Sequence, residues 1–272
     1  MWVADPASLI TVSVLIALYA FGAIAVGRTP AVKQLVAYGV GILVLVGTLT
    51  GPIDELTRER SFFIYIFQQM LLVFVIPPLL LAGLPDWMLR PVMTGKWVEP
   101  IARRLTRPLF AFLLFSLVFT LVHYPALCDR VCHIHPVFGD IRTLLLLTGL
   151  LLWWPLLSPL PEYPRMSYPL QVMYLFLLMI PMTAVAAPIT MANSVLYMFY
   201  MDGPHPFGLN PLSDQVLGGI LMWVGQGAYI MFVFTAIFVR WARVEDEEMP
   251  PINRQPAAQL QLLRSHDRRL RA

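Results

Sequence analysis

Charged residues are scarce in this chain of 272 residues, where they make up 13% against 58% hydrophobic residues. Soluble domains typically contain about 25% charged residues, so the composition excludes an ordinary soluble protein. Several apolar stretches reach the roughly 17–25 residues that a helix needs to cross a bilayer. We therefore expect one polytopic membrane domain. The formal net charge of +3 gives no support for nucleic-acid binding, because basic residues beside membrane spans are explained by topology.

The sequence also lacks the usual patterns of catalytic sites. It contains no Gly-rich phosphate loop, no Ser-His-Asp arrangement and no paired carboxylates within an apolar stretch. Hydrolysis and phosphoryl transfer depend on such groups. The sequence therefore gives no support to a hydrolase or a phosphoryl-transfer enzyme.

The hydropathy pattern predicts an all-α fold with seven transmembrane helices. The seven segments are Leu9–Val26, Gln34–Leu49, Phe62–Leu84, Pro108–Val122, Ile141–Leu157, Leu170–Ala187 and Val216–Val239. They place a seven-helix transmembrane domain at residues 1–242. The composition then changes abruptly to charged and Gln-rich residues, so residues 243–272 are interpreted as a polar tail.

The distribution of basic residues predicts the orientation of these spans. All but four of the 19 lysines and arginines fall on the loops that share a side with the tail; the exceptions are Arg58, Arg60, Arg130 and Arg142. The positive-inside rule then places the tail in the cytoplasm and the amino terminus outside. Asp5 is the only charge before the first span and no small-residue cleavage site follows, so we expect this span to be retained.

Prolines interrupt several of the apolar stretches. They occur at Pro77, Pro78, Pro155, Pro181 and Pro188. Because proline lacks an N–H group and clashes with the preceding turn, these positions predict kinked or broken helices packed against neighbours. A broken third and sixth span would also suit a small-solute transporter, although no matching repeat halves are visible.

A few polar side chains lie within or at the ends of the predicted spans. They are Gln69, Arg142, Asp214, Gln215 and Gln226. With alternating spans, most of them converge on the outer leaflet. Polar residues inside a membrane are candidates for a functional site. They also commonly hold helices together by hydrogen bonds, and that interpretation stays open here.

The densest group of potential metal ligands lies in the predicted outer loop between the fourth and fifth spans. The candidates are His123, Cys128, Cys132, His133 and His135. Thiolate and imidazole suit copper or zinc, which makes this loop a candidate copper site. The alternative is a disulfide between the two cysteines, because the loop would face an oxidising compartment.

Methionine thioethers are further soft ligands for copper(I). Met191, Met198 and Met201 lie with His205 in the last predicted outer loop. The methionines inside the spans are expected to be flexible packing residues.

Four blocks of sequence, in order, resemble the CtaG-type cytochrome c oxidase assembly factor family of bacterial inner membranes. The blocks are Gln69-Met70-Leu71-Leu72 with Pro77 to Pro85, His123-Tyr124-Pro125-Ala126-Leu127, Gly149 with Trp153-Trp154-Pro155, and Pro211-Leu212 with Asp214-Gln215, Gly218-Gly219-Ile220 and Met222-Trp223. The resemblance runs from about residue 60 to 242. It implies a seven-span inner-membrane protein that helps to mature the copper-containing core of haem–copper oxidases.

The chain departs from the family where paired histidines are usual. Counted from the proline and tryptophan landmarks, those positions fall on Tyr65 and Gln69 and on Phe138 and Arg142, so only His123 carries over. A buried Arg142 would also repel a cation. Two interpretations remain: copper handling at the outer Cys/His loop, or a metal-free scaffold or accessory subunit. The expected partners are the lipid bilayer and an oxidase subunit or copper chaperone.

Overall fold

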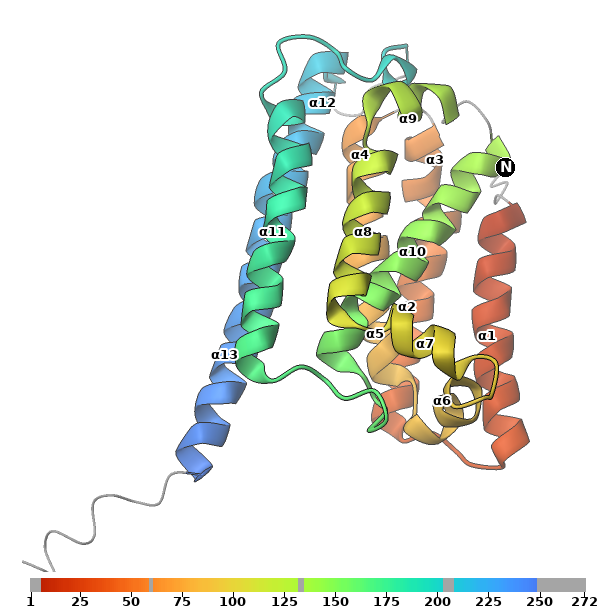
Figure 1. Ribbon diagram of the computed structural model, residues 1–272. Helices are drawn as coiled ribbons and strands as arrows, with labels where there is room; N and C mark the ends of the chain where they lie inside the picture. Colours follow the sequence, from red (N-terminus) through yellow and green to blue (C-terminus); the bar gives the residue numbers. More distant parts are fainter. Residues whose placement is uncertain (1–5, 59–60, 132–134, 203–207, 249–272) are drawn as a thin grey trace, which may run out of the picture.

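The computed structural model describes residues 6–58, 61–131, 135–202 and 208–248, and these residues form helices joined by short connections, with no strand among them (Figure 1). The helices are α1 (Pro6–Val26), α2 (Val32–Thr50), α3 (Pro52–Arg58), α4 (Phe62–Met70), η1 (Leu71–Val75), α5 (Ile76–Gly83), α6 (Asp86–Met93), α7 (Glu99–Leu105), α8 (Pro108–Val122), α9 (Pro125–Val131), α10 (His135–Leu157), α11 (Tyr168–Thr190), η2 (Met198–Tyr200), α12 (Pro211–Ile220), η4 (Leu221–Gly225) and α13 (Gln226–Glu248).

Each of the seven predicted spans lies within this helical framework, but length and composition identify fewer as candidate membrane helices. Five helices are long and apolar enough to cross a membrane, namely Pro6–Val26, Val32–Thr57, Phe62–Gly83, Tyr168–Thr190 and Pro211–Glu245. A sixth is reached if α7 and α8, which bend by 71°, form one span. Ile141–Leu157 is a shorter apolar helix. The protein is therefore a helical membrane protein with five to six candidate spans.

The helix formed by α4, η1 and α5 lies at the centre of the bundle. In its apolar window 67% of residues are buried, against 11% in α1. Helix α2 packs along α5, α10 packs along α8 and α5, and α12 packs along α4 (Figure 1). Helices α11 and α13 run side by side at one edge of the bundle (Figure 1).

The prolines do not break the third and sixth predicted spans, so the broken-helix alternative is wrong for these two spans. The third runs continuously from Phe62 to Gly83, with a π-helical segment, η1, directly before Pro77 and Pro78. The sixth is the single helix α11, with Pro181 and Pro188 inside it. The feature that would have suited a transporter with broken helices is therefore not found in these two helices.

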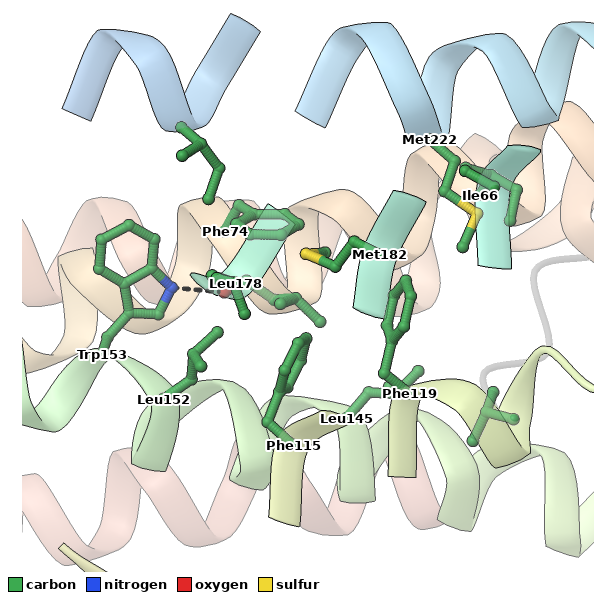
Figure 2. Packing of buried hydrophobic residues seen from close by; sticks show 14 of the residues in the cluster. Ile66, Phe74, Phe115, Phe119, Leu145, Leu152, Trp153, Leu178, Met182 and Met222 are labelled. Atoms are coloured by element: carbon green, nitrogen blue, oxygen red, sulfur yellow. Dashed lines mark hydrogen bonds between the residues drawn. The ribbon is translucent and has the colours of Figure 1, made fainter. Parts of the chain in front are cut away.

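Side chains from distant helices replace the hydrogen bonds that Pro77 and Pro78 remove. Neither proline has an N–H group to donate to the carbonyl four residues earlier, on Val73 and Phe74 respectively. The indole Nε1 of Trp153 donates to the Val73 carbonyl at 2.8 Å (Figure 2). The hydroxyl of Tyr229 donates to the Phe74 carbonyl at 2.5 Å. Helices α10 and α13 therefore complete the backbone bonding of the central helix, as an apolar medium requires.

A glycine lets α10 approach the central helix closely enough for the Trp153 bond. A Cβ atom on Gly149 would lie 3.1 Å from Cγ of Pro77 and 3.3 Å from Cα of Val73. Trp153 follows one turn later on α10. A larger residue at position 149 would push the helices apart and lengthen the bond to Val73.

Large apolar side chains fill the space between the helices. Phe115 and Phe119 of α8 point toward the interior, where Met182 of α11 and Met222 of η4 also lie (Figure 2). Both methionines are almost fully buried. They act as packing residues, as expected for methionines inside the spans.

Candidate functional site

One end of the bundle gathers many of the polar residues singled out in the sequence. This end, called here the α9 end, carries α9, the carboxyl end of α8 and the amino ends of α4 and α12 (Figure 1). Asp214, Gln215, Arg142 and His123 are all buried here. The expected convergence of these side chains at one end of the bundle is thus found.

Asp214 caps a helix other than its own. Its Oδ1 accepts a hydrogen bond from the Ser61 hydroxyl at 2.9 Å, and its Oδ2 accepts one from the Phe62 N–H at 2.6 Å. Ser61 in turn caps α4 by accepting from the Ile64 N–H. A carboxylate at a helix amino terminus is stabilised by the free N–H groups and the helix dipole. Asp214 therefore fixes α12 to α4.

Gln215 holds the connection that follows α11. Its Oε1 accepts from the Leu196 N–H at 2.7 Å, and its Nε2 donates to the Ser194 carbonyl at 3.4 Å. Nearby, a Cβ on Gly219 would lie 2.6 Å from Oγ1 of Thr190, so α12 and α11 pack closely. The side chains of Asp214 and Gln215 therefore form hydrogen bonds that hold helices and connecting segments together.

Arg142 forms a buried ion pair with Asp54 of α3. Their side chains are 2% and 5% exposed. The charge of Arg142 is therefore compensated within the protein, and its repulsion of a cation is correspondingly reduced. Sequence reasoning did not single out Asp54, which lies in a short helix between two predicted spans.

His123 presents a nitrogen lone pair inside the protein. Its Nδ1 lies 2.7 Å from the Phe119 carbonyl, and because a carbonyl oxygen only accepts, Nδ1 is the donor. In the neutral ring Nε2 then carries the lone pair, and this buried atom has no hydrogen-bond partner among the residues that the structure describes. The Tyr197 hydroxyl donates to the His123 carbonyl at 2.7 Å, which further fixes the residue.

Aromatic rings surround His123. The Phe119 ring lies 4.3 Å and the Tyr65 ring 6.5 Å from the imidazole, measured between centroids. Tyr200 extends this group, with its ring 5.6 Å from that of Tyr65. Sequence reasoning missed Tyr197 and Tyr200 because they lie in the connection between α11 and α12, far from His123 in the sequence.

Gln69 lies one helical turn below Tyr65 on α4. It is 4% exposed, and within the described part of the chain neither its Oε1 nor its Nε2 has a hydrogen-bond partner. Buried polar atoms nearly always have partners, so each exception calls for an explanation such as a bound water or ion.

The predicted Cys/His ligands are only partly within the described residues. Cys128 is buried on α9, and the adjacent Asp129 accepts from the Phe199 N–H at 3.1 Å, which joins α9 to η2. Cys132 and His133 lie outside the described residues, and His135 is described only as the first residue of α10. No group of three or more His, Cys, Asp or Glu that could hold a metal ion is found in the part of the chain that the structure describes.

The remaining candidate ligands and polar residues are dispersed. Met191, Met198 and Met201 are exposed on the connection between α11 and α12, with exposed fractions of 72%, 58% and 47%. His205 falls outside the described residues. Gln226 is buried where α13 begins, after η4 and away from the α9 end.

Comparison with known proteins identifies the family. The family model described as "Cytochrome c oxidase caa3 assembly factor (Caa3_CtaG)" matches residues 17–244. Two curated relatives, described as uncharacterized proteins of Mycobacterium bovis and Mycobacterium tuberculosis, are each 28% identical over 234 residues, covering 80% of this chain. The chain spans 35% of the length of these relatives. No solved structure matches the chain. The match to most of its length shows that this chain belongs to the family of cytochrome c oxidase caa3 assembly factors.

Proposed function

We propose that this protein assists the assembly of a haem–copper terminal oxidase in the bacterial inner membrane. The observation that carries the proposal is the family match over residues 17–244. Three residues of the blocks that resemble the family also support it, namely Trp153, Asp214 and Gln215. Each forms a hydrogen bond that joins two helices or a helix and a connecting segment, so the motif residues maintain this helix packing. A family of assembly factors is not a family of catalytic enzymes, and the protein is expected to act by binding.

The proposed topology has seven spans, with the amino terminus outside and the tail in the cytoplasm. To the five long apolar helices this topology adds the bent α7–α8 pair as one span and the shorter helix Ile141–Leu157 as another. The excess of basic residues on one set of loops supports this orientation. The α9 end then faces outward and would meet the oxidase subunit or copper chaperone there.

Copper is the proposed cargo at this end. His123 fits the role of a ligand, because its buried Nε2 carries a lone pair and none of the described residues forms a hydrogen bond with it. Imidazole and thiolate bind copper well. Cys128, Cys132, His133 and His135 follow within the next 12 residues and would supply further ligands. Copper would be held transiently and passed to the maturing oxidase.

A metal-free scaffold is the second candidate function. It is favoured because Tyr65 and Gln69 occupy two of the positions where the family usually has histidines. In this case the α9 end would dock an oxidase subunit without carrying copper.

Copper(I) stoichiometry of the purified, reduced protein separates these functions. The native protein is compared with His123→Ala and with Cys128→Ser/Cys132→Ser/His133→Ala/His135→Ala. Tyr124→Phe is the matched control, because Tyr124 adjoins His123 but is 60% exposed. Copper delivery predicts about one copper on the native and control proteins and its loss from both other variants. If no variant binds copper while all remain folded, the scaffold function is the one to keep.

A further inference from the structure

Two adjoining pockets lie at the end of the bundle opposite α9. The larger, of about 480 Å³, is bounded by α5, α6, α7 and α10 and is lined by apolar side chains apart from Thr106. Val98, Ile101 and Leu147 line it and are exposed, so the pocket opens on the surface of the bundle. The smaller pocket, of about 280 Å³, contains Arg103 and Arg107. A molecule with an apolar chain and a polar head would match this pair.

Trp154 connects the two pockets, since it lines both of them. It is 7% exposed, and its indole Nε1 has no hydrogen-bond partner in the described ranges of the chain. The neighbouring Trp153 donates to the backbone of η1, so the two residues of this motif have different roles. Buried donors nearly always have an acceptor, so this one calls for an explanation such as a bound oxygen atom.

The charges around the smaller pocket favour an anionic head. Arg103 pairs with Glu99 at 2.7 Å, and Glu162 pairs with Arg90 at 2.9 Å. Glu162 lines the smaller pocket, and its Oε2 has no hydrogen-bond partner among the described residues. Two arginines, Arg103 and Arg107, stand against this one carboxylate, so the lining keeps a net positive charge. Arg107, at the amino end of α8, forms no ion pair among the described residues and is left to bind an anion.

We propose that these pockets bind one anionic phospholipid, with a hydrocarbon chain in the larger pocket and the phosphate beside Arg107. An ester or phosphate oxygen of the lipid would accept the hydrogen bond of the Trp154 indole. Basic pockets between membrane helices are known sites for anionic lipid head groups. A zwitterionic choline lipid fits less well, because its quaternary ammonium would lie near arginine.

Lipid binding is measured by native mass spectrometry of the delipidated full chain, titrated with phosphatidylglycerol, phosphatidylcholine or inorganic phosphate. The test variant is Trp154→Phe/Arg107→Gln. The matched control is Trp97→Phe/Arg28→Gln, which makes the same two changes at residues that line neither pocket. Trp97 lies between α6 and α7, and Arg28 lies between α1 and α2. Ile101→Trp, a third variant, fills the larger pocket from an exposed position without removing a core side chain.

The proposal predicts one tightly bound phosphatidylglycerol on the native and control proteins. Binding is expected to be at least about tenfold weaker in the test variant and in Ile101→Trp. Phosphatidylcholine should bind about tenfold more weakly than phosphatidylglycerol. Equal binding by the test and control variants, or by the two lipids, would overturn the proposal. Displacement of the lipid by millimolar inorganic phosphate would also overturn it, since the site would then recognise free phosphate.

Discussion

The hydroxyl of Tyr229 is predicted to stabilise the protein by replacing the backbone N–H that Pro78 lacks. The variant Tyr229→Phe removes only this hydroxyl and leaves the Phe74 carbonyl, in a buried part of the central helix, without its donor. An unsatisfied buried backbone group costs about 1–3 kcal/mol. We therefore expect the free energy of unfolding to fall by about 1–2 kcal/mol.

A second substitution tests directly whether the Tyr229 hydroxyl replaces the N–H that Pro78 lacks. In Tyr229→Phe/Pro78→Ala, the new N–H of residue 78 lies four residues after Phe74 and can donate to its carbonyl. The double variant should therefore be more stable than the sum of the single variants predicts, by about 1 kcal/mol. Tyr229→Phe/Pro77→Ala is the matched control, because residue 77 follows Val73 by four residues and cannot serve Phe74 in the same way.

The assay is equilibrium unfolding in mixed micelles of a mild and a denaturing detergent. The coupling between positions is obtained from a double-mutant cycle for each proline. If both double variants are additive, the hydroxyl does not substitute for the missing N–H, and the explanation for the continuous central helix fails.

Three further predictions concern the other bonds between helices, each measured by the same unfolding assay. Trp153→Phe should cost about 2–4 kcal/mol, because it removes the donor to Val73 and also leaves a cavity. Asp214→Ala should cost about 1–3 kcal/mol by uncapping α4, and Asp214→Asn should cost less because one acceptor oxygen remains. Asp54→Asn should cost about 3–5 kcal/mol, because it removes the carboxylate that pairs with the buried guanidinium of Arg142. Asp54→Leu/Arg142→Met should recover most of this loss, and an equal loss in the double variant would contradict the assigned ion pair.

The positions of the helices could be predicted from the sequence, because long apolar runs separated by polar or Gly/Pro residues have few other structures in a membrane. The continuity of the third span could not be predicted from the sequence. Pro77 and Pro78 locally predict a break, and the groups that prevent it belong to Trp153 and Tyr229, about 80 and 155 residues away. No local pattern contains that information.

The candidate site was predictable to a similar degree. Alternating spans bring His123, Arg142 and Asp214 to one end of the bundle, as expected. Their partners depend on helix packing: Asp214 binds the amino end of α4, and Arg142 pairs with Asp54. The sequence therefore indicates where polar residues gather, but only the structure separates those used for packing from His123 and Gln69, which retain unpartnered atoms.

The most direct test of the central claim is the amount of assembled haem–copper oxidase in membranes of the source bacterium after deletion of this gene. Reduced-minus-oxidised haem spectra and the copper-to-haem ratio of the purified oxidase would be measured together. We predict that deletion lowers the assembled oxidase and that the native gene restores it, whereas His123→Ala, present at normal abundance, does not. An unchanged amount of oxidase with normal copper content in the deletion strain would contradict a role in its assembly.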